Sequence, residues 1–416
     1  VQTDGHLWAG TYDRKMRNIF EVQTDVAKKI AYALKSKLSP EEEARIDQIP
    51  TQNLEAYTLY KQGKEKYYQY SRDGYKESVE YFKRALGVDP MYSLAYAGLG
   101  DSYGQLFRAT FDTTYRDLAY SAVEKALKLD ENLAEGYKAL GLIYMYDNNP
   151  NESLRNNLKA IKLKPGMLDA IANVGLRYLG KGDLSESLEW LNKAIALDPY
   201  HRRIKWHVGR VHRFFGNIEE SEQVFLDGIV KNNDSFGCHL GLVVLHQQNG
   251  NNNKAKYFLD ELFRLRPTDN RIHRVASQYY FMNEDFQKTK EHILLLKEKN
   301  INDLIALAFT EKKLNNFKIS EDYLNEAKKI AIELLNKNAK NPLPIRSLAF
   351  INIMNQKNDE AFQLLEKFCD NGGLDYKSLL SNPIISKIKN DKRFLPLIDR
   401  IMENIDREKI EAGLTS

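Results

Sequence analysis

The segment from His201 to Phe215 combines arginine, tryptophan, histidine and phenylalanine side chains at helical spacing. The residues there that would share one face of a helix are Arg203, Trp206, His207, Arg210, Arg213 and Phe214. An arginine fork binds a carboxylate or phosphate through two parallel hydrogen bonds, and an indole ring supplies flat apolar area. This stripe therefore predicts a binding site for an acidic peptide or for a free carboxyl terminus.

A thinner version of the same stripe lies further along the chain. Its members are Arg271, Arg274, Val275, Gln278, Phe281 and Met282. The corresponding face of the segment between the two stripes offers small or uncharged residues, namely Gly237, Leu240, Gly241, Val244, Gln247 and Gln248. We expect the three stripes to line one groove with a basic, aromatic side and an open middle. The alternative is that the arginines form a solvated face and pair with neighbouring acids.

The short motifs that carry common enzyme chemistry are absent from the sequence. It contains no P-loop, HExxH, GxSxG or GxGxxG pattern. Acidic pairs such as Glu219-Glu220 fall where a helix would begin, and the helix dipole favours acids at that position. We therefore expect this chain to be no enzyme and to hold no cofactor.

A period of 34 residues runs through the chain. Pro165 and Pro199 are one period apart, and Asn233, Pro267 and Ile301 continue the series. Other positions keep the same phase, namely Leu140-Gly141, Val174-Gly175 and Val208-Gly209, then Tyr144, Tyr178 and His212, then Ala160 and Ala194. Small residues let two helices approach closely, and proline follows the second helix because it cannot continue it. The period and these residue types match the tetratricopeptide pattern of paired helices.

This repeat predicts an all-α fold, a right-handed superhelical solenoid of helical hairpins that each pack on their neighbours. We expect a regular array over residues 51–300 and degenerate hairpins with capping helices over residues 301–416. Residues 1–50 would be the remnant of a preceding domain and a linking helix. In tetratricopeptide solenoids the first helix of each unit lines the concave groove, so the basic stripes would lie there.

The eight histidines and two cysteines form no pattern of metal ligands. His212 and His246 occupy the repeat position of Tyr144, so packing between helices explains them. His239 and His246 are two helical turns apart, which is too far to share one ion on a straight helix. No CxxC or similar spacing accompanies Cys238 or Cys369. We therefore expect no metal site.

Both ends of the chain resemble segments that flank repeat arrays in one group of proteins. Near the start, a short strand and turn are expected from Gly5, Leu7, Trp8, Ala9, Tyr12, Asp13 and Arg14. A helix is expected to follow from about Asn18 to Ser36, and Leu38, Pro40 and Glu42 come after it. This phrase resembles the closing segment of the TolB-amino-terminal-like domain. Near the carboxyl end, Asn382-Pro383, Ile388, Asp391, Arg393-Phe394 and Leu397 resemble the usual ending behind such arrays, with Lys392 where the family has proline. The resemblance implies the carboxyl part of a bacterial signalling protein and a sensory or docking role.

Charge and hydropathy favour a protein or peptide partner. The 61 basic residues barely exceed the 57 acidic ones, whereas a nucleic-acid-binding protein usually has a steeper bias. No run of about 18 apolar residues is present to span a membrane. Two alternatives stay open, a nucleic acid bound along the groove, or self-association through Tyr67, Tyr68, Tyr70, Phe107 and Phe111 as part of a larger signalling enzyme. Sequence upstream of Val1 would decide between a cytoplasmic and a periplasmic location.

Overall fold

The computed structural model describes residues 19–33, 51–110, 112–147, 149–230, 236–267 and 269–414. These residues form helices joined by short loops, and none of them lies in a strand. The all-α repeat fold predicted from the sequence is therefore confirmed. The strand expected between Gly5 and Arg14 lies outside the described residues. Residues 1–149 and 162–164 form one compact unit, here called unit 1, and residues 150–161 and 165–416 form unit 2.

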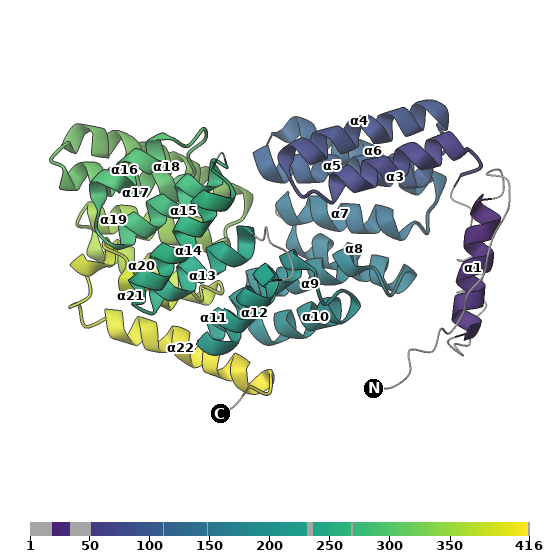
Figure 1. Cartoon of the computed structure of the whole chain (residues 1–416). Coiled ribbons are helices and arrows are strands. Elements are labelled where there is room, and N and C mark those ends of the chain that lie inside the picture. The colour runs from purple at the N-terminus through teal and green to yellow at the C-terminus, as the bar shows by residue number, and fades with distance from the viewer. Residues whose placement is uncertain are drawn as a thin grey trace. The chain divides into compact units, whose positions relative to one another are not determined.

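Unit 1 is a stack of helical hairpins in which α3 packs on α4 and α5 packs on α6 (Figure 1). Its core contains Tyr75, Phe82 and Val123, which are almost completely buried. The helix expected from about Asn18 to Ser36 is found as α1. The helices of this unit are α1 (Ile19–Ala33), α3 (Leu54–Tyr67), α4 (Arg72–Val88), α5 (Ser93–Thr110), α6 (Thr113–Leu129) and α7 (Ala134–Tyr146).

Unit 2 continues the hairpin pattern, with paired helices packed as α9 on α10, α11 on α12, α13 on α14, α15 on α16, α17 on α18 and α19 on α20. Its largest apolar cluster reaches from Ile171 to Ile405. The helices are α8 (Pro150–Leu163, whose last residues belong to unit 1), α9 (Leu168–Lys181), α10 (Leu184–Leu197), α11 (Arg202–Phe215), α12 (Ile218–Val230), α13 (Phe236–Gln248), α14 (Asn252–Leu265), α15 (Arg271–Met282), α16 (Phe286–Leu294), α17 (Ile301–Lys313), α18 (Phe317–Lys337), α19 (Pro342–Met354) and α20 (Asn358–Asp370).

Small residues bring the hairpins of unit 2 into close contact. A Cβ atom built on Gly209 of α11 or on Gly241 of α13 would lie 2.4 Å from the ring of Phe225. Helices α11 and α13, which are the first helices of two successive hairpins, thus enclose the Phe225 ring of α12 between them. At the end of α11, Gly216 takes a left-handed conformation with φ of 78°, a helix-ending geometry that favours glycine. The glycines of the repeat therefore act through close approach and through chain reversal.

The carboxyl segment closes unit 2 with α21 (Tyr376–Ser381), the 3₁₀ turn η2 (Ile385–Lys387) and α22 (Phe394–Glu411). Helix α22 packs on α10, α11 and α20 (Figure 1). Leu379 and Ile385 are completely buried, and the backbone N–H of Ser185 donates to Glu408 Oε2 at 2.9 Å. This segment is consequently a fixed part of the unit 2 core.

Candidate functional site

A pocket of about 330 Å³ opens within unit 2 between the first helices of successive hairpins and the carboxyl segment. Helices α11, α13, α15, α17 and α19 supply one part of its lining, and residues 375–384 supply the rest. Its charged residues are Arg210, Arg213, Asp303, Arg346 and Asp375, and its aromatic residues are Trp206, Phe281 and Phe350. The pocket therefore combines an apolar wall with several buried charges.

The helical period places the lining residues of each helix on one face. Trp206, Arg210 and Arg213 follow each other on α11 at spacings of four and three. Helix α13 adds Leu240, Gly241, Val244, Gln247 and Gln248, and α15 adds Ser277, Gln278, Phe281 and Met282. The structure thus brings together Trp206, Arg210, Arg213 and Gln278 from the expected partner-binding set, with most of the intervening stripe.

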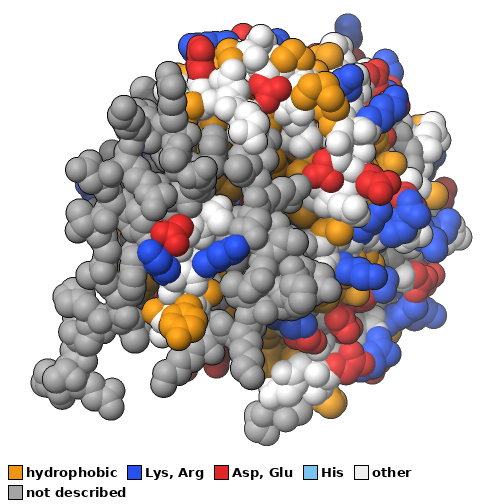
Figure 2. All heavy atoms as spheres, turned by 90° about the vertical axis from the view of Figure 1, so that its right-hand side faces the viewer, with side chains coloured by type: hydrophobic (Ala, Val, Ile, Leu, Met, Phe, Trp, Pro, Cys, Tyr) orange, Lys and Arg blue, Asp and Glu red, His pale blue; other side chains and the backbone are white. Residues whose placement is uncertain are grey.

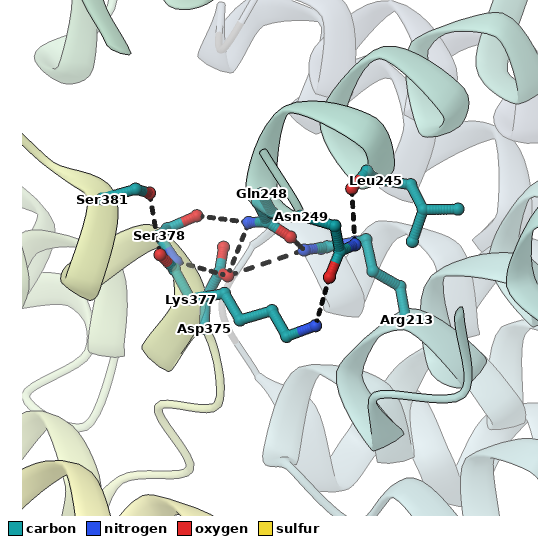
Figure 3. Close-up of polar contacts among 8 residues, drawn as sticks. All are labelled: Arg213, Leu245, Gln248, Asn249, Asp375, Lys377, Ser378 and Ser381. Atoms are coloured by element: carbon teal, nitrogen blue, oxygen red, sulfur yellow. Dashed lines mark hydrogen bonds and ion pairs between the residues drawn. The ribbon is translucent and has the colours of Figure 1, made fainter. Parts of the chain in front are cut away.

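Arg213 is already engaged by side chains of its own chain (Figure 3). Its Nη1 atom donates to Gln248 Oε1 at 2.6 Å and lies 3.6 Å from Asp375 Oδ1. Gln248 Nε2 in turn donates to Asp375 Oδ1 at 3.1 Å and to Ser378 Oγ at 2.7 Å. Beside this cluster, Lys377 Nζ donates to Asn249 Oδ1 at 2.9 Å. The polar network joins α11 and α13 to the carboxyl segment.

The charge of Asp375 is stabilised in this network. Burial raises the pKa of the Asp375 carboxyl, but the guanidiniums of Arg213 and Arg346 and the hydrogen bonds from Ser378 outweigh burial and hold the pKa below its ordinary value. Asp375 is therefore an ionised counter-ion inside the pocket.

Arg210 has no such counter-ion. Among the described residues, no carboxylate lies within ion-pair distance of its guanidinium, whose polar contact is with His207 Nδ1 at 3.4 Å. The guanidinium carbon lies 5.2 Å from the centre of the Trp206 ring. Burial, and to a smaller extent the neighbouring Arg213, lowers the pKa of Arg210 to about 10, while Asp375 opposes that shift. Arg210 is thus a desolvated cation facing the pocket.

Arg346 is a second arginine of the pocket without a described counter-ion at ion-pair distance. The residue pattern of the sequence did not identify it as a site residue. Its Nε atom is buried with no hydrogen-bond partner, and no described carboxylate lies within ion-pair distance. Burial lowers the pKa of Arg346, and the more distant charge of Asp375 opposes the shift. Arg346 stands four 34-residue periods after Arg210, which is the signal that could have identified it. Because the repeat consensus weakens after Ile301, the sequence alone did not show that Arg346 occupies the same repeat position as Arg210.

The other residues of the expected set lie outside the pocket lining. Arg271 Nη2 donates to Asp269 Oδ2 at 2.5 Å, and Arg274 Nε donates to Asp303 Oδ2 at 3.0 Å. These two arginines therefore follow the alternative of pairing with neighbouring acids. The remaining members of the set, Arg203, His207 and Phe214, are also absent from the lining. His207 is buried against the Trp206 ring, and the Arg213 guanidinium packs over the Phe214 ring.

His212 and His246 of unit 2 take part in helix packing. His246 is buried and stacks on Phe258 with ring centres 5.6 Å apart. Burial lowers the pKa of both His212 and His246. Within the described ranges, no group of three His, Cys, Asp or Glu side chains is arranged to hold a metal ion.

Comparison with known proteins places the repeat in a family. Residues 168–201, which cover α9 and α10, match the model of the tetratricopeptide repeat. A protein of Rhizobium meliloti (strain 1021) named putative adenylate cyclase 3 is 32% identical over 145 residues, which are 34% of this chain. The chain spans only 24% of the length of that relative.

Solved structures of low sequence identity are similar to parts of the chain. A tetratricopeptide repeat protein from Parabacteroides merdae is 17% identical with a TM-score of 0.44, covering 55% of this chain and 92% of its own. The human IFIT1 dimer with PPP-AAAA is 16% identical with a TM-score of 0.46, covering 84% of this chain and 77% of its own.

Of the helices described, none is both long and apolar enough to cross a membrane. The family match and the stacked hairpins identify an all-α fold of tetratricopeptide-type repeats, in which residues 168–201 are the repeat that the family model matches.

Proposed function

We propose that this chain is a protein-interaction scaffold that binds an acidic segment of a partner in the unit 2 pocket. The observation that carries this proposal is the pair of guanidiniums, Arg210 and Arg346, that face the pocket with no carboxylate beside them in the described structure. Repeat solenoids present concave surfaces of this kind to their partners. A partner carboxylate would supply the missing counter-ion.

Physical chemistry favours such an occupant. A charged group taken out of water without a counter-ion is costly, and the lowered pKa of Arg210 and Arg346 reflects that cost. An acidic group between them would recover it through charge-assisted hydrogen bonds, which are about twice as strong as neutral ones. The rings of Trp206, Phe281 and Phe350 would bury an apolar part of the same segment.

Two observations disfavour the alternatives. A nucleic acid needs a continuous basic stripe, but Arg271 and Arg274 are neutralised by Asp269 and Asp303. Figure 2 shows the side of the molecule that lies at the right of Figure 1, and there the described Lys and Arg side chains are interspersed with Asp and Glu. For self-association, Tyr67 and Phe107 are buried within unit 1, whereas Tyr68 is 45% exposed and Phe111 lies outside the described residues, so only part of the expected patch is open to a second copy.

We further propose that the array serves as the docking part of a bacterial signalling protein. The resemblance of both chain ends to segments flanking such arrays supports this, as does the partial match to a protein named putative adenylate cyclase. No cyclase activity is assigned to the residues of this chain. Translation of the gene upstream of Val1 tests the proposal, because a signalling or sensory domain should be encoded there.

Capture of partners by the immobilised chain tests the scaffold proposal. Three chains would be compared, which are the parent, the double variant Arg210→Gln with Arg346→Gln, and the control Arg264→Gln. All three must have the same helical content. Arg264 is a suitable control because it is exposed and pairs with Glu261 away from the pocket. We expect one or more proteins that bind the parent and the control but not the double variant, and that lose binding when an acidic segment is deleted. Partners that bind all three chains equally would place the interaction elsewhere, and capture removed by nuclease would favour a nucleic acid.

A further inference from the structure

We infer that the group entering the unit 2 pocket is a phosphorylated side chain of the partner rather than a simple carboxylate. This inference rests on the proposed function, because it takes the same pocket and the same partner-binding role. It goes further by naming the chemistry of the recognised group, a phosphate monoester carried on a peptide.

The charges around the pocket carry the argument. Two of its three arginines have no acidic partner, because Asp375 is held by Arg213, and Asp303 is held by Arg274 and accepts from the Asn300 backbone N–H. Arg210 and Arg346 thus carry two positive charges with no described carboxylate at ion-pair distance, and the more distant Asp375 offsets them only in part. A carboxylate brings one negative charge, whereas a phosphate monoester brings about −1.5 to −2 at pH 7. A single phosphorylated side chain therefore matches the charge of the pocket where a single carboxylate would leave an excess.

The polar side chains of the lining supply further donors. Gln278, Asn302 and Asn382 line the pocket, and their side-chain amides donate no hydrogen bond to any described residue. The amides of Gln247 and Gln248, by contrast, already donate to Tyr279 O and to the Asp375–Ser378 pair. A phosphate monoester offers three acceptor oxygens, one more than a carboxylate. The two guanidiniums and the three unused amides are donor groups in the lining that are available to these oxygens.

The shape of the pocket limits what carries the phosphate. Leu379, Asn382 and Ile384 line one side, and Leu379 and Ile384 are at most 1% exposed, so this wall belongs to the core. A groove-binding helix needs several anchors spread over two turns, whereas this partly open pocket offers a space of about 330 Å³. The space suits one side chain, with its stem against Trp206 and Phe281.

Peptide libraries provide the test, since the flanking sequence of the partner is unknown. Four degenerate libraries would differ only in a fixed central residue, which is phosphotyrosine, phosphoserine, glutamate or serine. Binding to the intact chain would be measured by fluorescence anisotropy, with phenyl phosphate and inorganic phosphate as free competitors. The variants Arg210→Gln and Arg346→Gln remove the two uncompensated charges, and Arg264→Gln is the matched control on the outer surface.

We expect at least one phosphorylated library to bind about tenfold or more tighter than the glutamate library, as stronger charge-assisted bonds require. Either pocket variant should remove most of that preference, and the control should keep it. Equal binding of the glutamate and phosphorylated libraries would overturn this inference and leave the proposed function intact. Binding of no library would overturn both, and binding of phenyl phosphate alone would overturn the peptide source in favour of a small phosphate ester.

Discussion

The Asp375 carboxylate lies 3.6 Å from the Arg213 guanidinium, and Gln248 donates to the same oxygen at 3.1 Å. The chain thus satisfies one arginine of the α11 stripe with its own carboxyl segment. Arg210, three residues earlier, and Arg346 keep their charges without a partner among the described residues. Arg213 therefore stabilises the fold, whereas Arg210 and Arg346 are available to a ligand.

Replacing Asp375 by Asn should destabilise unit 2. The change leaves Arg213 with a weaker acceptor and adds an uncompensated charge to the pocket, a loss of about 1–3 kcal/mol in the free energy of unfolding. Urea unfolding followed by circular dichroism measures it, with Asp399→Asn on the exposed surface as the control. The same variant should bind an acidic probe more tightly than the parent does. Unchanged stability would show that the Arg213–Asp375 pair has no net structural role.

The contribution of Asp375 should depend on pH in a defined direction. Its folded-state pKa lies below the ordinary value, so the ionised form favours the folded chain. This stabilisation is complete above the unfolded-state pKa of about 3.9 and is lost as the pH falls through the lower folded-state value. The difference in unfolding free energy between the parent and Asp375→Asn should therefore be constant between about pH 5 and 7 and shrink below about pH 4. A difference that grows on acidification would contradict the assigned direction.

Replacing Arg346 by Met should stabilise the free protein. Arg346 is half-buried with no described carboxylate at ion-pair distance, and a flexible apolar side chain of similar length removes its desolvation cost together with a weaker attraction to Asp375, a net gain of about 1 kcal/mol. Thermal unfolding would show a higher Tm for Arg346→Met, no change for the exposed Arg264→Met, and a lower Tm for Arg213→Met, which breaks the pair with Asp375. Destabilisation by Arg346→Met would mean that this arginine supports the fold.

Gly209→Ala should disturb the packing of α11 on α12. The new methyl group would lie 2.4 Å from the Phe225 ring, and that ring is completely buried with Gly241 on its other approach. We expect a loss of about 1–3 kcal/mol, as overpacked cores show. Gly180→Ala is the matched control, because nothing lies within 4 Å of its added Cβ and alanine favours a helix. Equal effects of the two substitutions on unfolding would exclude steric overlap as the cause.

Unit 1 contains a buried ion pair whose two halves should be strongly coupled. Lys138 Nζ donates to Asp101, and both side chains are almost completely buried. Lys138→Met leaves a buried carboxylate alone, which costs about 3–5 kcal/mol, whereas adding Asp101→Leu should recover most of the loss. Hydrogen exchange of α5 and α7 would report the effect locally. A loss in the double variant equal to the sum of the losses from Lys138→Met and Asp101→Leu alone would show that the two residues act independently.

Residue spacing alone was enough to predict the helical hairpins. The 34-residue period places small, aromatic and proline residues where paired helices need them, and these requirements are local to each unit. Spacing also placed Trp206, Arg210 and Gln278 in the pocket, because side chains three and four apart share a helix face. The positions of single residues on a helix are therefore determined by the sequence through short-range geometry.

The tertiary structure decided which of these charges are neutralised. Asp375 reaches Arg213 only because the carboxyl segment folds back on α11 and α13, a contact that depends on the packing of every intervening hairpin. Arg274 and Asp303 meet through the packing of two neighbouring first helices, α15 and α17. Helical periodicity says which way a side chain points within its own helix, whereas the partner it meets depends on the relative placement of segments far apart in the chain.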